Sequence, residues 1–274
     1  MILGLLLLGG GATAGFFGSL LGLGGGVLIV PLLTLGFGLP LRESVAVSLV
    51  CVIMTSSAAA GVYLERHVAN LRLGMTLELF TALGALVGGS IAFLLEERLI
   101  SLLFAGLLIY TAMTMARPRR SVPVEEAPVD DVLAAPATEP HETRDRLSGS
   151  GYRVRNLRMG VAGASFAGVV SALLGVGGGT IKVPLMHLAM GVPLRVATAT
   201  SNLMMGVTAA ASAVIYVIHG GLDPYVVGPT AIGVFLGASA GSRVSHRVHV
   251  NVLRLLFVVV LGYTAIQMLL RALA

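Results

Sequence analysis

The sequence has little charge, few aromatic side chains and a single cysteine. Only 11% of its 274 residues are charged and 56% are hydrophobic, whereas soluble domains carry about 25% charged residues. This balance excludes an ordinary soluble domain and predicts a chain embedded in a lipid bilayer. The one cysteine, Cys51, excludes an internal disulfide. No histidine spacing indicates a metal site and no nucleophile is patterned with a general base, so we expect no metal, no cofactor and no enzyme activity.

Apolar runs of about 20 residues recur along the chain, each long enough to cross a hydrocarbon core about 30 Å thick. No basic segment precedes the first run, which predicts a spanning helix rather than a cleaved signal peptide. Residues 117–157 differ sharply, because they are rich in proline, carry seven acidic residues and show no apolar periodicity. The sequence therefore divides into a membrane region at 1–116, a charged linker at 117–157 and a second membrane region at 158–274.

The two membrane regions are copies of each other. The run from Leu20 to Ser48 matches the run 153 residues later, with 16 of 29 positions identical. Each copy contains three consecutive glycines, at 24–26 and 177–179, and glycine costs about 1 kcal/mol relative to alanine inside a helix. Each triplet therefore predicts a helix break. The apolar piece that follows spans roughly 18 Å of helix, about half a bilayer. We expect an all-α polytopic membrane protein in which each copy has a Gly-broken re-entrant hairpin plus three transmembrane helices.

Basic residues predict how the copies are oriented. Eight of the 18 Lys and Arg residues lie between Arg117 and Arg158, and the positive-inside rule places this linker in the cytoplasm. The charge thus reflects topology, and we expect no nucleic-acid partner. Inverted copies place 14 basic residues inside and three outside, whereas parallel copies would give 11 and six. The sequence therefore predicts two inverted repeats.

The two glycine breaks are the candidate binding site. Inverted repeats would bring them together near the membrane midplane, as in many secondary transporters. Glycine lets a ligand approach the backbone, and N–H groups at the start of a helix bind oxyanions. The alternative is close packing of small residues between helices. The candidate substrate-binding residues are Gly24, Gly25, Gly26, Ser48, Gly177, Gly178, Gly179, Thr180, Lys182, Ser201 and Asn202.

Lys182 follows the second triplet by three residues, where the first copy has Ile29. A lysine inside a membrane is costly and lies unfavourably near a helix N-terminus, which predicts a compensating anionic substrate. The alternative is a side chain that snorkels to the interface. Glu78 could carry a coupling proton, but its place near the start of a span favours an interfacial acid. For His187, we expect a helix–helix hydrogen bond rather than titration.

Other polar residues recur at matched positions in the two copies. Arg42 and Arg195 each follow a proline and could guide anions to the two entrances, or simply anchor the helices at the interface. The hydroxyls of Ser48 and Ser201 and the amide of Asn202 could donate hydrogen bonds to sulfur-bound or carboxyl oxygens. They could equally join helices to each other.

The doubled motif resembles the sulfite exporter TauE/SafE family of membrane permeases. The resemblance rests on Gly22-x-Gly24-Gly25-Gly26 with Pro31, on Gly175-x-Gly177-Gly178-Gly179 with Pro184, and on the Pro-Leu-Arg that follows each. It implies transport of sulfite, an organosulfonate or a related small sulfur oxyanion across the bacterial inner membrane. It also implies a substrate region at the two glycine motifs and their prolines, Pro31 and Pro184.

These observations predict an anion permease that works by alternating access, as a monomer or a homodimer. Export fits the energetics, since an inside-negative potential drives anions outward by about 2.3 kcal/mol per charge per 100 mV. One alternative is an ion-coupled importer of thiosulfate, a sulfonate or a carboxylate. Another, from a different class, is a membrane-embedded enzyme or a scaffold subunit.

Overall fold

The computed structural model describes residues 2–21, 24–65, 69–116, 147–148, 152–244 and 250–273. All elements in these ranges are helices. The first repeat contains α1 (Ile2–Leu21), α2 (Gly26–Pro31), the π-helical turn η1 (Leu32–Gly36), α3 (Leu41–Glu65), α4 (Leu71–Leu94) and α5 (Glu97–Ala116). The second contains α8 (Leu157–Leu174), α9 (Gly179–Pro184), η2 (Leu185–Ala189), α10 (Leu194–Ile218), α11 (Pro224–Val244) and α12 (Val250–Leu273). Most of the predicted linker lies outside the described residues.

Each half-length segment changes from an α-helix to a π-helix at its proline. Pro31 ends α2 and η1 follows directly, and Pro184 and η2 repeat this order. Proline has no N–H and its ring clashes with the preceding turn, so the regular hydrogen-bond ladder stops there and a wider π turn follows. The sequence predicted the breaks and the short helices, but it did not predict the π turns.

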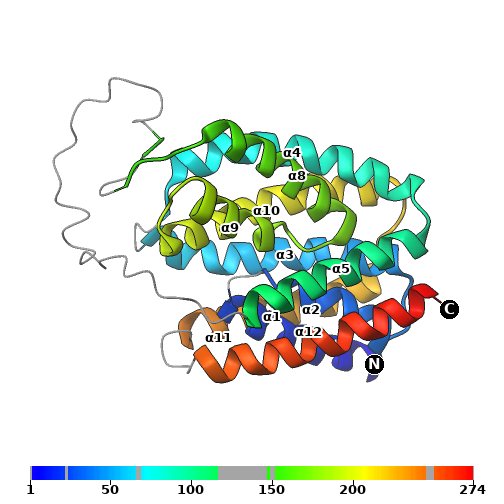
Figure 1. Ribbon diagram of the computed structural model, residues 1–274. Coiled ribbons are helices and arrows are strands. Elements are labelled where there is room, and N and C mark those ends of the chain that lie inside the picture. The colour runs from blue at the N-terminus through cyan, green and yellow to red at the C-terminus, as the bar shows by residue number, and fades with distance from the viewer. Residues whose placement is uncertain are drawn as a thin grey trace.

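Helices of one repeat pack mainly against helices of the other. The first helix of each repeat packs against the third full-length helix of the other repeat, so that α1 contacts α11 and α8 contacts α4. In addition, α5 packs on α12 and α3 packs on α10. The contacts are therefore symmetric: each pair of helices either joins two equivalent helices or has an equivalent pair in the other repeat. Figure 1 shows α3 and α10 in the middle of the bundle, between α4 and α8 at the top and α11 and α12 at the bottom.

Glycine allows the closest of these pairs to touch through their backbones. A Cβ added to Gly237 of α11 would overlap the carbonyl oxygen of Ala12 in α1, and one added to Gly168 of α8 would overlap that of Thr81 in α4. Small residues of this kind let membrane helices approach closely. Packing therefore explains many glycines of the chain, including several outside the two triplets.

The equivalent helices α3 and α10 run in opposite directions where they touch. The Ser56 hydroxyl donates to the Asn202 carbonyl near the start of α10. Near the start of α3, Ala46 lies close to Gly221, just beyond the end of α10. The side of the membrane that each end faces stays a prediction.

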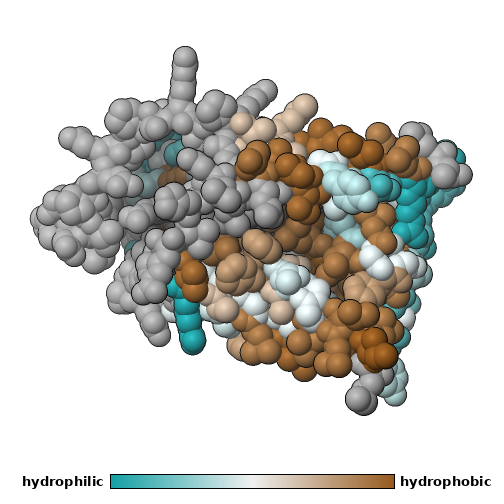
Figure 2. Space-filling view, turned by 90° about the horizontal axis from the view of Figure 1, so that it is seen from below, coloured by the Kyte–Doolittle hydropathy of each residue, from teal (hydrophilic) through white to brown (hydrophobic). Residues whose placement is uncertain are grey.

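The outer surface of the bundle is apolar, as a lipid-facing surface must be. Seven of the described helices are long and apolar enough to cross a membrane. Large hydrophobic side chains such as Leu79, Phe166, Leu236 and Leu255 are exposed. Figure 2 shows one face covered mainly by hydrophobic residues, with hydrophilic ones gathered near one end. The chain is therefore a multi-pass membrane protein.

Inverted repeats predict where engineered cysteines can be labelled from. In a Cys51→Ala background, a cysteine in the 117–157 linker should react with an impermeant maleimide only from the cytoplasm. Asp223→Cys, at an exposed position beside Gly221, should react only from outside. The measurement is labelling of whole cells against inside-out vesicles. Labelling of both positions from one side would contradict the inverted topology.

Candidate functional site

The glycine triplets form two left-handed turns that start the short helices. Gly24 and Gly25 have φ of 73° and 74°, and Gly177 and Gly178 have φ of 77° and 74°. This region of backbone space is strained for other residues. Carbonyl groups at the breaks accept hydrogen bonds from buried hydroxyls, since Thr55 Oγ1 donates to Gly24 O at 2.8 Å and Ser48 Oγ to Gly175 O at 2.7 Å.

The two breaks lie against each other in the interior. A Cβ on Gly26 would overlap the carbonyl oxygen of Gly175. A Cβ on Gly24 would lie 2.9 Å from the Met205 sulfur, and one on Gly179 would lie 2.6 Å from the same atom. The side chains of Met205 and Val52, which is its equivalent in the first repeat, are fully buried and pack against both breaks. The meeting of the breaks agrees with the sequence expectation, and these two side chains close the space between them.

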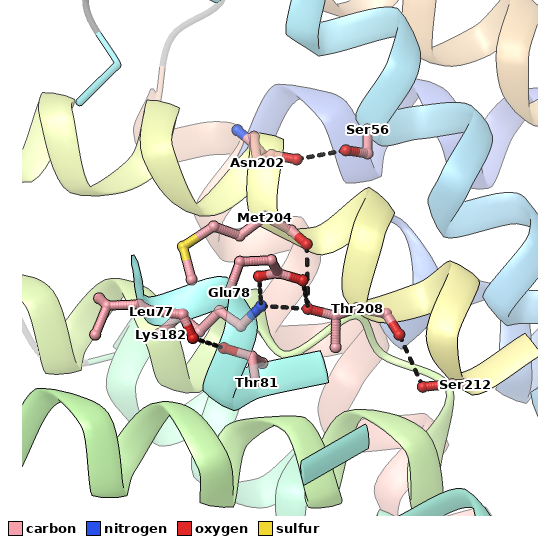
Figure 3. A network of polar contacts seen from close by, with 9 residues as sticks. All are labelled: Ser56, Leu77, Glu78, Thr81, Lys182, Asn202, Met204, Thr208 and Ser212. Atoms are coloured by element: carbon pink, nitrogen blue, oxygen red, sulfur yellow. Dashed lines mark hydrogen bonds and ion pairs between the residues drawn. The ribbon is translucent and has the colours of Figure 1, made fainter. Parts of the chain in front are cut away.

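Lys182 of α9 is the centre of a buried polar network (Figure 3). Its side chain is 1% exposed and Nζ lies 3.2 Å from Oε2 of Glu78, which comes from α4 in the other repeat. Nζ also donates to Thr208 Oγ1 at 2.6 Å, and that hydroxyl donates to Glu78 Oε1 at 2.6 Å. Among the described residues, these contacts use two of the three N–H bonds of the ammonium.

This network corrects one expectation and excludes one alternative. Glu78 is not an interfacial acid, because its residue is 7% exposed and its carboxylate is paired with Lys182. Lys182 does not snorkel, because its ammonium ends on buried groups. The positive charge that predicted an anionic substrate already has an anion beside it. Removing two charges from water is expensive, and each ion of the pair offsets this cost for the other.

The start of α4 determines where Glu78 lies along that helix. Asn70 caps the helix, as its Oδ1 accepts from Leu73 N at 3.0 Å. Its Nδ2 donates to Leu147 O and to the Tyr152 hydroxyl, and burial raises the pKa of that hydroxyl. Glu78 follows two turns later and faces the interior between α9 and α10.

Three buried hydroxyls border the second break without a partner in the described structure. They belong to Ser171, Thr180 and Ser201. A Cβ on Gly178 would lie 3.3 Å from Lys182 Cε and 3.4 Å from Ser171 Cβ, and one on Gly179 would lie 3.6 Å from Ser201 Oγ. A buried donor without a partner costs about 1–3 kcal/mol. These groups therefore indicate a place where a ligand could accept hydrogen bonds.

The remaining candidates lie elsewhere. Arg42 donates to the Leu95 carbonyl and its guanidinium lies 6.0 Å from the Phe93 ring, so it joins α3 to the end of α4. Arg195 is in the first turn of α10, and its side chain lies outside the described residues. Asn202 is buried and its carbonyl accepts from Ser56. The His187 ring contacts the Val192 carbonyl at 3.0 Å, within its own turn rather than between helices.

The polar network has no counterpart at the equivalent positions of the repeat. The equivalents of Lys182 and Glu78 are Ile29 and Ala231, which lie in one apolar cluster. Thr208 has an equivalent hydroxyl, Thr55, which bonds to Gly24 instead. Sequence reasoning treated Lys182 and Glu78 separately. The signal that connects them is that both replace an apolar residue at the same 153-residue offset.

A polytopic bundle with two helix breaks meeting in its interior defines the chain as a membrane transporter. The family model for Sulfite exporter TauE/SafE matches residues 7–268, and the chain belongs to this family. “Probable membrane transporter protein YunE” of Bacillus subtilis (strain 168) is 23% identical over 268 residues, covering 94% of both chains. A “Probable membrane transporter protein” of Xylella fastidiosa (strain 9a5c) is 26% identical over 245 residues, covering 89% of this chain and 85% of its own. No solved structure matches the chain.

The ion pair makes a prediction about stability. Lys182→Met leaves the Glu78 carboxylate buried without its cation, which should destabilise the protein by about 3–5 kcal/mol. The double variant Glu78→Gln with Lys182→Met should recover most of that loss. The measurement is the thermal unfolding midpoint in detergent, with Glu97→Gln, a change at an exposed acid, as the control. Additive losses in the double variant would show that the two charges are not coupled.

Proposed function

We propose that this chain is a permease for a small sulfur oxyanion, with sulfite or an organosulfonate as the substrate class. The observation that supports it most is the set of hydroxyls of Ser171, Thr180 and Ser201, which have no partner in the described structure and border the same glycine break as Lys182. An anion with several oxygens offers an acceptor to each of these donors. Its negative charge suits an ammonium that keeps one N–H bond without a partner among the described residues.

The anion site belongs mainly to the second break. Thr180 and Lys182 follow Gly179 on α9, whereas the first break has Val27 and Ile29 at these positions. The first break contributes backbone, and α3 of the same repeat contributes the closing side chain Val52. Alternating access then requires the two breaks to separate, so that Val52 and Met205 no longer fill the space between them. Export follows from an inside-negative potential, which acts on any net negative charge that crosses.

Ion-coupled uptake is the second candidate, and the buried carboxylate of Glu78 favours it. This carboxylate lies 3.2 Å from the Lys182 ammonium that would bind the anion, close enough for a proton on Glu78 to respond to anion binding. Entrance guidance stays a proposal for Arg42 and Arg195. A hollow of about 280 Å³ between α5 and α12, lined by Glu97, Arg98, Ser101, Arg271 and Ala272, offers anions a further cationic surface at the bundle end.

Thr180→Val tests the anion site with little disturbance of the fold. The change keeps the shape of the side chain and removes a hydroxyl that has no partner among the described residues. Binding of sulfite should weaken by about 10- to 150-fold, the equivalent of 1.5–3 kcal/mol for a hydrogen bond to a charged group. The unfolding midpoint should stay the same or rise. Isothermal titration with sulfite gives the affinity.

Thr111→Val is the matched control. Thr111 is equally buried, but its hydroxyl donates to the Leu107 carbonyl within α5, away from the breaks. Sulfite affinity should not change in this variant. Equal affinities in the wild-type protein and Thr180→Val would remove the hydroxyl from the proposed site.

A further inference from the structure

We propose that Glu78 is the binding site of a coupling proton, taken up when the anion binds at Lys182. This inference rests on the proposed function, since it names the ion that accompanies the substrate. The structure places the only acid of α4 against the only charged side chain of α9. Each ion is buried, and the two come from different repeats.

Electrostatics connects the proton to the anion. In the described state the Lys182–Glu78 pair is neutral overall. A substrate anion that reaches the ammonium adds a second negative charge within a site that excludes water. Two negative charges close together disfavour each other's ionised form, and a low dielectric makes this stronger. A proton on Glu78 removes the repulsion and frees the ammonium to face the substrate.

The hydrogen bonds around Glu78 can accommodate that proton. Thr208 Oγ1 now donates to Glu78 Oε1, and the Met204 carbonyl lies 3.1 Å from the same hydroxyl. When the carboxyl group is protonated it becomes a donor. The Thr208 hydroxyl can then turn its hydrogen to Met204 O and accept from Glu78. No polar group loses its partner in either state.

No other acid in the surroundings can take this role. The helices packed against α4 are α8 and α10, and neither these nor α9 and η2 contain an acid. The titratable groups that they carry are Arg158 in the first turn of α8, Lys182 of α9, His187 of η2, and Arg195 and Tyr216 of α10. Tyr216 donates to the Ala172 carbonyl, and His187 contacts the Val192 carbonyl. Of these groups, Lys182 alone bonds to Glu78 in the described structure.

The coupling proton determines the net charge that crosses the membrane with each anion. One proton enters from water with the anion and leaves with it on the other side. A dianion therefore crosses with one net negative charge, so that the membrane potential still drives it outward. A monoanion crosses without net charge and follows its own gradient and that of the proton.

Proton uptake on binding is the direct test. Thiosulfate is the probe, because it remains a dianion from mildly acidic to mildly alkaline pH. Titration calorimetry in buffers of different ionisation enthalpy gives the number of protons taken up per anion. The wild-type protein should take up close to one near neutral pH, with affinity rising as the pH falls. Glu78→Gln should take up none and bind with an affinity independent of pH. The control Glu96→Gln, a change at an exposed acid outside the hollow between α5 and α12, should keep the wild-type proton count.

The outcomes separate the two proposals. If the wild-type protein binds neither thiosulfate nor sulfite, the proposed function is wrong. If it binds without proton uptake, or if Glu78→Gln still takes up a proton, only the proton site is wrong. If Glu78→Gln does not fold, Thr208→Val is the second variant that tests the proton site. Loss of the hydroxyl that stabilises the carboxylate should move proton uptake to higher pH, and an unchanged pH midpoint would overturn the assignment to Glu78.

Discussion

The buried charge of Lys182 is the constraint on which the packing of the helices around it depends. It is the only lysine in the chain, and it lies where an ammonium has no access to water. An ion in such a place must have an opposite charge and hydrogen bonds close by. Glu78 and Thr208 supply both. Because these groups come from α4, α9 and α10, the pair fixes the position of a broken helix of one repeat against a full-length helix of the other.

The backbone of the two repeats is nearly symmetric, whereas the Lys182–Glu78 site is not. The two repeats form the same helices and the same glycine turns, and their breaks meet around Val52 and Met205. The side chains differ, because Ile29 and Ala231 occupy the positions equivalent to Lys182 and Glu78. The two copies thus share one backbone plan, and one substitution in each copy places a buried ion pair on one side only.

Much of this structure could be predicted from residues alone. Low charge and long apolar runs identified an all-α membrane protein, and the doubled glycine triplets identified the breaks and the TauE/SafE family; the model and the family match confirm these points. The pairing of Lys182 with Glu78 could not be predicted, because the partners are 104 positions apart. Only the tertiary packing brings them together, because α4 and α9 both pack against α8 and α10. The prediction that Glu78 is an interfacial acid was wrong for the same reason. A position near the end of a helix does not show whether the side chain is exposed or is covered by neighbouring helices.

Locating the bound anion tests the central claim most directly. Selenite is a selenium analogue of sulfite, and its anomalous scattering in a crystal of the protein gives its position without reference to the protein density. The account predicts a peak at the second break, within hydrogen-bond distance of Lys182 Nζ and Thr180 Oγ1. A peak at the hollow between α5 and α12 instead, with none at the breaks, would contradict it.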